Sequence, residues 1–238
     1  MKMKNKKILV RDIGKLSFLD AWQYQEKIFK KTIDQKVQNR SLNKTIETKN
    51  FLILTEHNHV YTIGKSGDMS NLLIDKDELK KREIEFFKIN RGGDITYHGP
   101  GQIMGYPIFD LDNFFTDINL YLRKLEEVII NTLDSYNITG FTIKDETGVW
   151  VKDNNGLSKK ICAFGIRASR WVTMHGLCFN VNPDLSYFNH IIPCGIKNKG
   201  ITSLQELKKE DIDINEVKLT LVDNFKLVFN AEINFEAN

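Results

Sequence analysis

The chain has 238 residues, of which 41% are apolar and 27% are charged, and its 34 basic and 31 acidic residues give a net charge of +3. This composition is ordinary for a globular domain with a sizeable core, and so small a charge excess does not indicate nucleic-acid binding. No apolar run approaches the roughly 20 residues that cross a bilayer, so no membrane partner is expected. We expect one domain over residues 1–238.

The start of the chain and its cysteines predict a cytoplasmic location. The first residues are rich in lysine, but the apolar run at 8–10 is too short for the core of a signal peptide. Three cysteines are too few, and odd in number, for a disulfide framework, which favours a reducing compartment. The sequence has no Cys-x-x-Cys or His-x-x-x-His spacing, so no metal site is expected.

Short apolar runs bounded by glycine or polar residues predict strands. They occupy residues 7–11, 51–54, 60–63, 84–89, 103–109, 141–144, 148–152, 161–167, 172–181 and 231–235. Residues 153–156 read Asp-Asn-Asn-Gly, which indicates a hairpin turn between two of these strands.

Apolar residues spaced three or four apart predict helices. The first helix begins after Ser17, which fits the N-cap, and continues to residue 37, followed by a polar surface loop over 38–50. The clearest helical pattern covers 118–136, a short helix is expected at 203–209, and a last one follows Asp213. Strand-rich stretches broken by long helices predict an α+β or mixed α/β fold.

A glycine-rich stretch over 91–102, with the sequence RGGDITYHGPGQ, connects two of the predicted strands and holds four of the fifteen glycines. Glycine brings no side chain to a core, so such a cluster indicates a backbone conformation that other residues rarely adopt. Its main chain can also approach a ligand closely. The exposed N–H groups, with Arg91 beside them, would suit a polar or anionic atom. A tight connector whose polar groups satisfy one another is the alternative. The stretch matches neither the phosphate-cradling nor the dinucleotide glycine pattern.

Of the three cysteines, Cys194 is the candidate nucleophile. Cys162 and Cys178 lie within apolar strand runs, where a free thiol behaves as a small buried hydrophobe. Cys194 lies in a Pro-Cys-Gly turn after the irregular segment 183–200, where a thiol can be accessible and oriented. The alternative is an unreactive cysteine in a turn.

A cysteine nucleophile needs a nearby imidazole, ammonium or helix N-terminus to lower the pKa of its thiol. His98 and His175 are candidates, because each stands next to a glycine in a strand or loop context. Lys160 directly precedes an apolar strand, where its ammonium would lie at the edge of a pocket. A solvent-facing lysine is the alternative for Lys160.

Several blocks of the sequence resemble the octanoyltransferases, the lipoyl(octanoyl) transferase family of lipoate biosynthesis. The stretch RGGDITYHGPGQ is similar to the signature of that family, and other blocks follow in the order of the family. The matching blocks are 51–67, 91–102, 148–151, 160–167, 175–182, 193–195 and 202–204. They cover about 51–204, whereas the first helix and the last helix and strand match only in general character.

The resemblance implies the fold of biotin and lipoate protein ligases, a mixed sheet flanked by helices. It implies that Cys194 carries the acyl chain as a thioester and that Lys160 lowers the pKa of that thiol and relays protons. The residues implied to line the acyl pocket are Arg91, Gly92, Gly93, Asp94, Ile95, Thr96, Tyr97, His98, Ala163, Phe164, Gly165, Gly176, Leu177 and Cys178. Phe164, Leu177 and Tyr97 are the candidate walls.

The chain departs from the family pattern near these positions. Cys178 stands where alanine is usual, and Ile192 and Ile196 flank the Pro-Cys-Gly where polar or aromatic residues are common. These differences would reshape a pocket wall but leave both implied catalytic residue types in place.

The activity implied by the resemblance is transfer of an octanoyl group from octanoyl-acyl carrier protein to a specific lysine of lipoyl domains, the first step of protein lipoylation. The implied acceptors are the lipoyl domains of 2-oxoacid dehydrogenase E2 subunits and the glycine cleavage H protein. Exchange of one thioester for another is nearly thermoneutral and amide formation runs downhill, so no cofactor and no nucleotide are expected. A monomer is expected.

Two other functions remain as alternatives. An ATP-dependent lipoate or biotin protein ligase of the same fold would not need a cysteine nucleophile, and transfer without ATP separates it from a transferase. A non-catalytic module would only shelter an acyl chain or dock a lipoyl domain. The presence of both Cys194 and Lys160 favours the transferase over such a module.

Overall fold

The computed structural model describes residues 4–153, 155–193 and 200–236. Cys194, the predicted nucleophile, and Ile196 lie outside the described residues. None of the described helices is both long and apolar enough to cross a membrane.

The described residues contain strands and α-helices in similar amounts, and the strands build the centre of the fold. They are β1 (Lys7–Lys15), β2 (Asn50–Glu56), β3 (Val60–Ile63), β4 (Glu85–Lys88), β5 (Ile95–His98), β6 (Gln102–Ile108), β7 (Phe141–Ile143), β8 (Glu146–Lys152), β9 (Ser158–Ser169), β10 (Val172–Asn180), β11 (Gly200–Ile201) and β12 (Glu232–Phe235). The α-helices are α1 (Phe18–Ser41), α2 (Lys76–Lys81), α3 (Ile118–Asp134), α4 (Leu204–Lys208) and α5 (Ile214–Phe229). Short 3-10 helices cover Met69–Asn71, Leu111–Asn113 and Leu185–His190.

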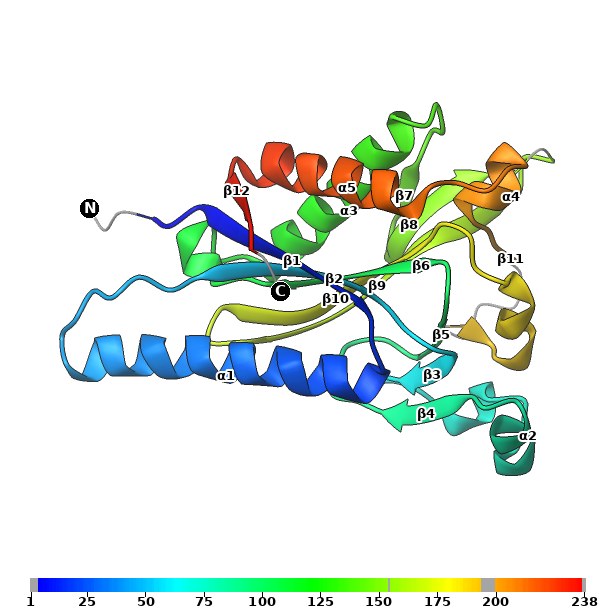
Figure 1. Ribbon diagram of the computed structural model, residues 1–238, viewed down its shortest axis with the longest axis horizontal. Coiled ribbons are helices and arrows are strands. Elements are labelled where there is room, and N and C mark those ends of the chain that lie inside the picture. The colour runs from blue at the N-terminus through cyan, green and yellow to red at the C-terminus, as the bar shows by residue number, and fades with distance from the viewer. Residues whose placement is uncertain (1–3, 154, 194–199, 237–238) are drawn as a thin grey trace.

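Within the described residues, nine strands form one mixed sheet in the order β12-β1-β2-β6-β10-β9-β8-β7, with β11 paired to β9. β1 runs parallel to both β2 and β12, whereas β2, β6, β10, β9, β8 and β7 pair antiparallel. A second sheet of three strands has the order β4-β3-β5 and lies beside the first turn of α1 (Figure 1). This arrangement confirms the predicted mixed sheet flanked by helices.

The helices cover opposite faces of the main sheet (Figure 1): α1 lies along one face, and α3 and α5 pack together on the other. Successive side chains of a strand point to opposite faces of the sheet, so β10 contributes residues to the cores on both faces. Leu177 and Phe179 join the core under α3 and α5, whereas Met174 and Cys178 join the core under α1.

The first helix begins as predicted but ends later. The Ser17 hydroxyl accepts a hydrogen bond from the Asp20 N–H at 3.1 Å, which is the expected N-cap. The helix continues to Ser41, into the predicted loop over 38–50. Asn39 explains the extra turn, because its buried amide donates to the Ile46 carbonyl at 2.6 Å and folds the following loop back against the helix.

The glycine-rich stretch is the main correction to the predicted elements. It was expected to be a loop over 91–102, but residues 95–98 form β5, which pairs antiparallel with β3. The β-branched and aromatic residues Ile95, Thr96 and Tyr97 suit a strand, and the glycines on both sides supply the turns. Gly93 and Gly101 have φ of +85° and +82°, values that favour glycine.

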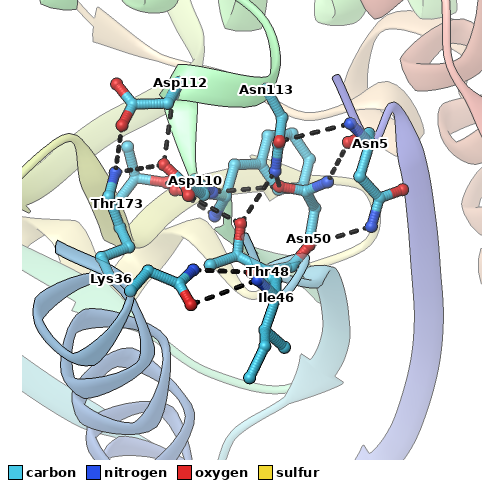
Figure 2. Close-up of polar contacts among 11 residues, drawn as sticks. Asn5, Lys36, Ile46, Thr48, Asn50, Asp110, Asp112, Asn113 and Thr173 are labelled. Atoms are coloured by element: carbon cyan, nitrogen blue, oxygen red, sulfur yellow. Dashed lines mark hydrogen bonds and ion pairs between the residues drawn. The ribbon is translucent and has the colours of Figure 1, made fainter. Parts of the chain in front are cut away.

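A buried polar cluster fixes the end of the main sheet away from β3 (Figure 2). The Asp110 carboxylate, directly after β6, accepts from the Thr48 hydroxyl at 2.7 Å and forms an ion pair with Lys36 of α1. The Asp110 N–H donates to the Asn50 side chain at 3.0 Å. Lys36 also contacts the Asp112 carboxylate at 2.9 Å. The cluster therefore ties α1, the start of β2 and the end of β6 together.

We predict that Lys36→Met lowers the free energy of unfolding by about 3 kcal/mol, because it leaves the buried Asp110 carboxylate without its cation. The side chain of Asp110 is 5% exposed in this pair. Urea unfolding of both proteins measures the difference. Lys124→Met is the matched control, because its ion pair with Glu127 is partly solvated and should contribute less than about 1 kcal/mol. Equal losses in the two variants would contradict the structural role of the Lys36 ion pair.

Candidate active site

A cavity of about 510 Å³ is bordered by β5, β6, β9 and β10, by the first turn of α1 and by the start of the glycine-rich stretch. It brings together most residues that the sequence predicted for an acyl pocket. Those that line it are Arg91, Gly92, Gly93, Asp94, Ile95, Thr96, His98, Lys160, Ala163, Phe164, Gly165, Gly176, Leu177 and Cys178.

Tyr97 does not line the cavity, in contrast to the prediction. Alternation along β5 turns Thr96 and His98 toward the cavity and Tyr97 to the other face of the small sheet. There the Tyr97 ring is fully buried and stacks on Tyr187 at 5.0 Å between centroids. Its hydroxyl lies 2.8 Å from Nδ1 of His59. Tyr97 is a core residue of the small sheet.

Arg91 folds back into the protein at the wall of the cavity. Its side chain donates to the Thr62 carbonyl at 2.8 Å, the Thr62 hydroxyl at 2.9 Å and the Gly92 carbonyl at 2.9 Å. The Gly92 N–H donates to the Ile166 carbonyl of β9 at 2.9 Å. Arg91 and Gly92 therefore attach the glycine-rich stretch to both sheets, and both residues line the cavity.

Lys160 lines the cavity as a buried lysine with a defined position. It is 8% exposed, and its Nζ donates to the Thr147 carbonyl at 3.1 Å. The same Nζ lies 4.7 Å from the centroid of the Trp150 ring, a cation–π contact. Gly148 has φ of +137°, and a Cβ there would lie 3.0 Å from Cε of Lys160. The turn and bulge of β8 thus hold the ammonium in place.

A chain of hydrogen bonds connects the glycine-rich stretch to Lys160. The Gly99 N–H donates to Gln102 Oε1 at 2.9 Å, and Gln102 Nε2 donates to Asn180 Oδ1 at 2.8 Å. Asn180 Nδ2 donates to the Thr202 carbonyl at 3.0 Å, and the Thr202 N–H donates to the Lys160 carbonyl at 3.0 Å. These buried groups fix β11 against β9 at the position of Lys160.

Both described flanks of the segment that contains Cys194 border this cavity. Pro193 lines it on one side, and Ile201, which pairs with Lys160 across β9 and β11, lines it on the other. Ile192 is held by a hydrogen bond from its N–H to the Asn71 carbonyl at 2.8 Å. The Asn71 amide in turn donates to the Asp94 carboxylate at 2.6 Å. The position of Cys194 itself lies outside the described residues.

The cavity holds two imidazoles that the sequence proposed as activators of the cysteine. Burial and the positive charge of Arg91 lower the pKa of His98 well below its ordinary value. Burial likewise lowers the pKa of His175 to about 3. Both rings are therefore neutral at physiological pH, and neither supplies a cation. Of the activators named from the sequence, Lys160 is the one that brings a positive charge to the cavity.

Sequence reasoning missed several residues that shape the site. Phe18, Met104 and Tyr106 line the cavity from α1 and β6, where they looked like ordinary core residues. Gln102 and Asn180 gave a clearer signal, because each is an amide at the end of an apolar strand run and is almost fully buried. Buried amides need partners, so such residues indicate a hydrogen-bonded network.

Comparison with known proteins decides the family. The model of the family described as Lipoyl protein ligase A/B catalytic domain matches residues 17–226. An octanoyltransferase of Christiangramia forsetii is 54% identical over 98% of this chain and 100% of its own length. Octanoyltransferases of Flavobacterium psychrophilum and Bacteroides thetaiotaomicron are 53% and 43% identical, over 96% and 90% of this chain and 99% and 92% of their own lengths.

The chain belongs to the octanoyltransferase family. The family expected from the sequence blocks is therefore confirmed, and so is the expectation of an acyltransferase enzyme. Among solved structures, a bipartite lipoate protein ligase of Thermoplasma acidophilum is similar, with a TM-score of 0.72 over 99% of this chain and 87% of that chain. A lipoate-protein ligase A bound with ATP has a TM-score of 0.70 over 98% and 88% of the two chains. Their identities of 17% and 16% show a shared fold alone.

The buried imidazoles predict that stability falls in mild acid. His57 Nδ1 donates to the Leu16 carbonyl at 2.8 Å and Nε2 accepts from the Tyr106 hydroxyl at 2.7 Å, and burial lowers the pKa of His57 to about 4. An unfolded imidazole gains its proton near pH 6.5, whereas folded His57 and His175 stay neutral until about pH 4 and 3. The stability that these neutral imidazoles contribute is therefore fully present above pH 6.5 and is lost as the pH falls from 6.5 toward their folded pKa values.

We expect each of these imidazoles to lower the free energy of unfolding by roughly 2 kcal/mol between pH 7 and pH 5. Urea unfolding at several pH values measures the slope. His57→Gln should remove the contribution of one imidazole to this pH dependence of the free energy of unfolding, whatever its effect on stability at pH 7. Parallel pH dependences of the variant and the wild type would show that folding does not lower the pKa of His57.

Proposed function

We propose that this protein transfers an octanoyl group from octanoyl-acyl carrier protein to a lysine of lipoyl domains, through a thioester on Cys194 with Lys160 as acid and base. The observation that carries the proposal is Lys160, a buried lysine at the wall of a cavity that both described flanks of the segment containing Cys194 also line. The octanoyltransferase relatives supply the reaction, and the sequence blocks supply the two catalytic positions.

Chain connectivity supports a place for Cys194 near the cavity. Consecutive Cα atoms lie about 3.8 Å apart, and Pro193, directly before Cys194 in the sequence, lines the cavity that Lys160 also lines. Of the other two thiols, Cys162 is fully buried, and Cys178 lines the cavity but is 5% exposed. Burial raises the pKa of both, so neither supplies a thiolate. Cys194 is thus the thiol left for the chemistry.

The proposed reaction has two half-reactions. In the first, the Cys194 thiolate attacks the thioester carbon of the donor, a new thioester forms, and the departing sulfur of the carrier protein takes a proton from the Lys160 ammonium. In the second, the amine of the acceptor lysine attacks the acyl-enzyme, an amide forms, the neutral Lys160 amine takes the proton of the attacking amine, and Cys194 leaves as a thiolate. The pair of Cys194 thiolate and Lys160 ammonium is thereby regenerated, and no nucleotide enters the balance.

The cavity suits an apolar chain. Its wall includes the apolar side chains of Phe18, Met104, Phe164 and Leu177. Gly165 allows Arg91 to pack against β9 at this wall, because a Cβ at Gly165 would lie 2.7 Å from Cδ of Arg91. Burial of each methylene of an acyl chain there would contribute roughly 0.8 kcal/mol. The volume of about 510 Å³ lies within the range of about 300–1,000 Å³ that small-molecule sites occupy.

An ATP-dependent ligase is the second candidate, and the likeness of the fold to lipoate protein ligases is what favours it. That likeness rests on identities of 16–17% and carries the fold alone. Identity of 54% to an octanoyltransferase over its whole length weighs more for the reaction. We therefore place the transferase first, and transfer without ATP decides between the two.

The partners follow from the reaction. The donor would be octanoyl-acyl carrier protein, and the acceptors would be lipoyl domains of 2-oxoacid dehydrogenase E2 subunits and the glycine cleavage H protein. We further propose that residues 1–238 act as one catalytic unit, as a monomer, in the cytoplasm where those partners are made.

We predict that incubation of the wild type with octanoyl-acyl carrier protein, without ATP, adds one octanoyl group that hydroxylamine removes. Cys194→Ala should form no acyl-enzyme, because it lacks the attacking sulfur. Lys160→Met should form it at least about tenfold more slowly, because the thiolate loses its neighbouring cation. Mass spectrometry of the intact protein measures all three.

The matched control is Cys162→Ala, which removes a buried thiol and should leave acylation intact. Acylation of the Cys194→Ala variant at the wild-type rate would overturn the proposed nucleophile. A strict requirement for ATP together with free octanoate would favour the ligase instead.

A further inference from the structure

Two buried imidazoles at the cavity each have a ring nitrogen without a hydrogen-bond partner among the described residues. These atoms are Nδ1 of His98 and Nε2 of His175. Both residues line the cavity, and they are 5% and 3% exposed. A buried polar atom without a partner is costly, so two of them on one cavity indicate a ligand group that supplies the missing hydrogen bonds.

The hydrogen bonds of Thr62 determine which ring nitrogen of neutral His98 carries the proton. The Thr62 hydroxyl oxygen accepts from Arg91 at 2.9 Å and lies 3.2 Å from Nε2 of His98. Among the described residues, Nε2 of His98 is the acceptor within reach of the hydroxyl proton, so Thr62 donates to it. Neutral His98 then carries its own proton on Nδ1, and this N–H is the donor available at the cavity.

His175 is held firmly in an unusual backbone conformation. Its φ is +58°, which is rare for a residue with a side chain, and its N–H donates to Gln25 Oε1 of α1 at 3.0 Å. The Nε2 atom of the fully buried Gln25 amide also lacks a partner among the described residues. The surroundings of His175 are therefore polar, although Phe18, Met104 and Tyr106 also line the cavity.

The polar surroundings of His175 lie far from Lys160 along the sheet. His175 pairs with Ile166, six residues beyond Lys160 on β9. At about 3.3 Å per residue, the two backbone positions are about 20 Å apart. An extended eight-carbon chain spans about 9 Å with bonds of about 1.5 Å, and the side chains at both ends occupy part of the remaining distance. An octanoyl chain that starts beside Lys160 and runs along β9 would point its methyl end toward His175, and each further methylene would bring that end closer.

We propose that His98 and His175 form a polar subsite that holds a water molecule beyond the methyl end of the acyl chain and thereby sets the upper limit of chain length. The inference rests on the proposed function, because it concerns the same cavity. The N–H of His98 and the Nε2 atom of His175 can each form a hydrogen bond with water in the cavity, whereas a methylene can bind to neither. A longer chain would displace the water and leave both nitrogens without partners.

Acyl-enzyme formation from thioesters of three chain types tests this proposal. We expect the wild type to prefer octanoyl over decanoyl, and to use ω-hydroxydecanoyl about fivefold or more faster than decanoyl, since the terminal hydroxyl replaces the displaced water. His98→Phe keeps a planar ring, which stacks on Phe18 in the wild type at 6.1 Å and 5°. This variant should raise the ratio of decanoyl to octanoyl rates about tenfold and abolish the advantage of the hydroxyl.

His59→Phe is the matched control, because the His59 ring stacks on Tyr187 at 4.1 Å and is not among the residues that line the cavity. It should leave the chain-length ratios of the wild type unchanged. Equal use of decanoyl and ω-hydroxydecanoyl by the wild type would overturn the proposal, even if His98→Phe does not fold. So would a His98→Phe variant with wild-type ratios. A wild type that accepts no acyl group at all would instead refute the proposed function.

Discussion

Two buried amides, Gln102 and Asn180, provide the contact on which the geometry of the site depends. Their side chains meet at 2.8 Å, and through their other atoms they hold the glycine-rich stretch and β11. Each amide sits at the end of a long apolar strand, where an unpaired polar group would be costly. The network must therefore form as a unit, and when it does, three segments far apart in sequence converge around Lys160. The cavity is the space that this convergence leaves between the two sheets.

Within that space, charge and polarity are distributed along the length of β9. The ammonium of Lys160 lies at one end, against the Thr147 carbonyl and the Trp150 ring. Apolar side chains, glycines and the neutral imidazoles of His98 and His175 line the rest of the cavity, and His175 pairs with Ile166, six residues beyond Lys160 on β9. This order fits a ligand with a reactive polar head and an apolar tail of limited length. It also explains why the chain needs so many glycines between strands that are otherwise rich in large side chains.

Much of this architecture could be predicted from the sequence. The Ser17 cap, the face of α3 and the hairpin between β8 and β9 follow local rules, and each is confirmed. The family blocks named a pocket lining that the structure largely brings together. Two strands of the small sheet were predicted, but β5 was missed because it is four residues long and is enclosed by glycines, so its strand character shows only when it pairs with β3. Tyr97 was misassigned for the same reason, since the face of a residue is defined only once the strand is known. Contacts such as Gln102 with Asn180 join residues 78 positions apart, which no local pattern specifies.

The central claim is that Lys160 favours the ionised thiol of Cys194. The most direct test is the rate of Cys194 alkylation against pH, followed by mass spectrometry of the modified protein. Cys162 and Cys178 should not interfere, because burial raises the pKa of both thiols. We expect the half-maximal rate to lie at a lower pH than for an ordinary thiol and to move upward in Lys160→Met. The same midpoint in both proteins would contradict the account, because the ammonium would then have no influence on the sulfur.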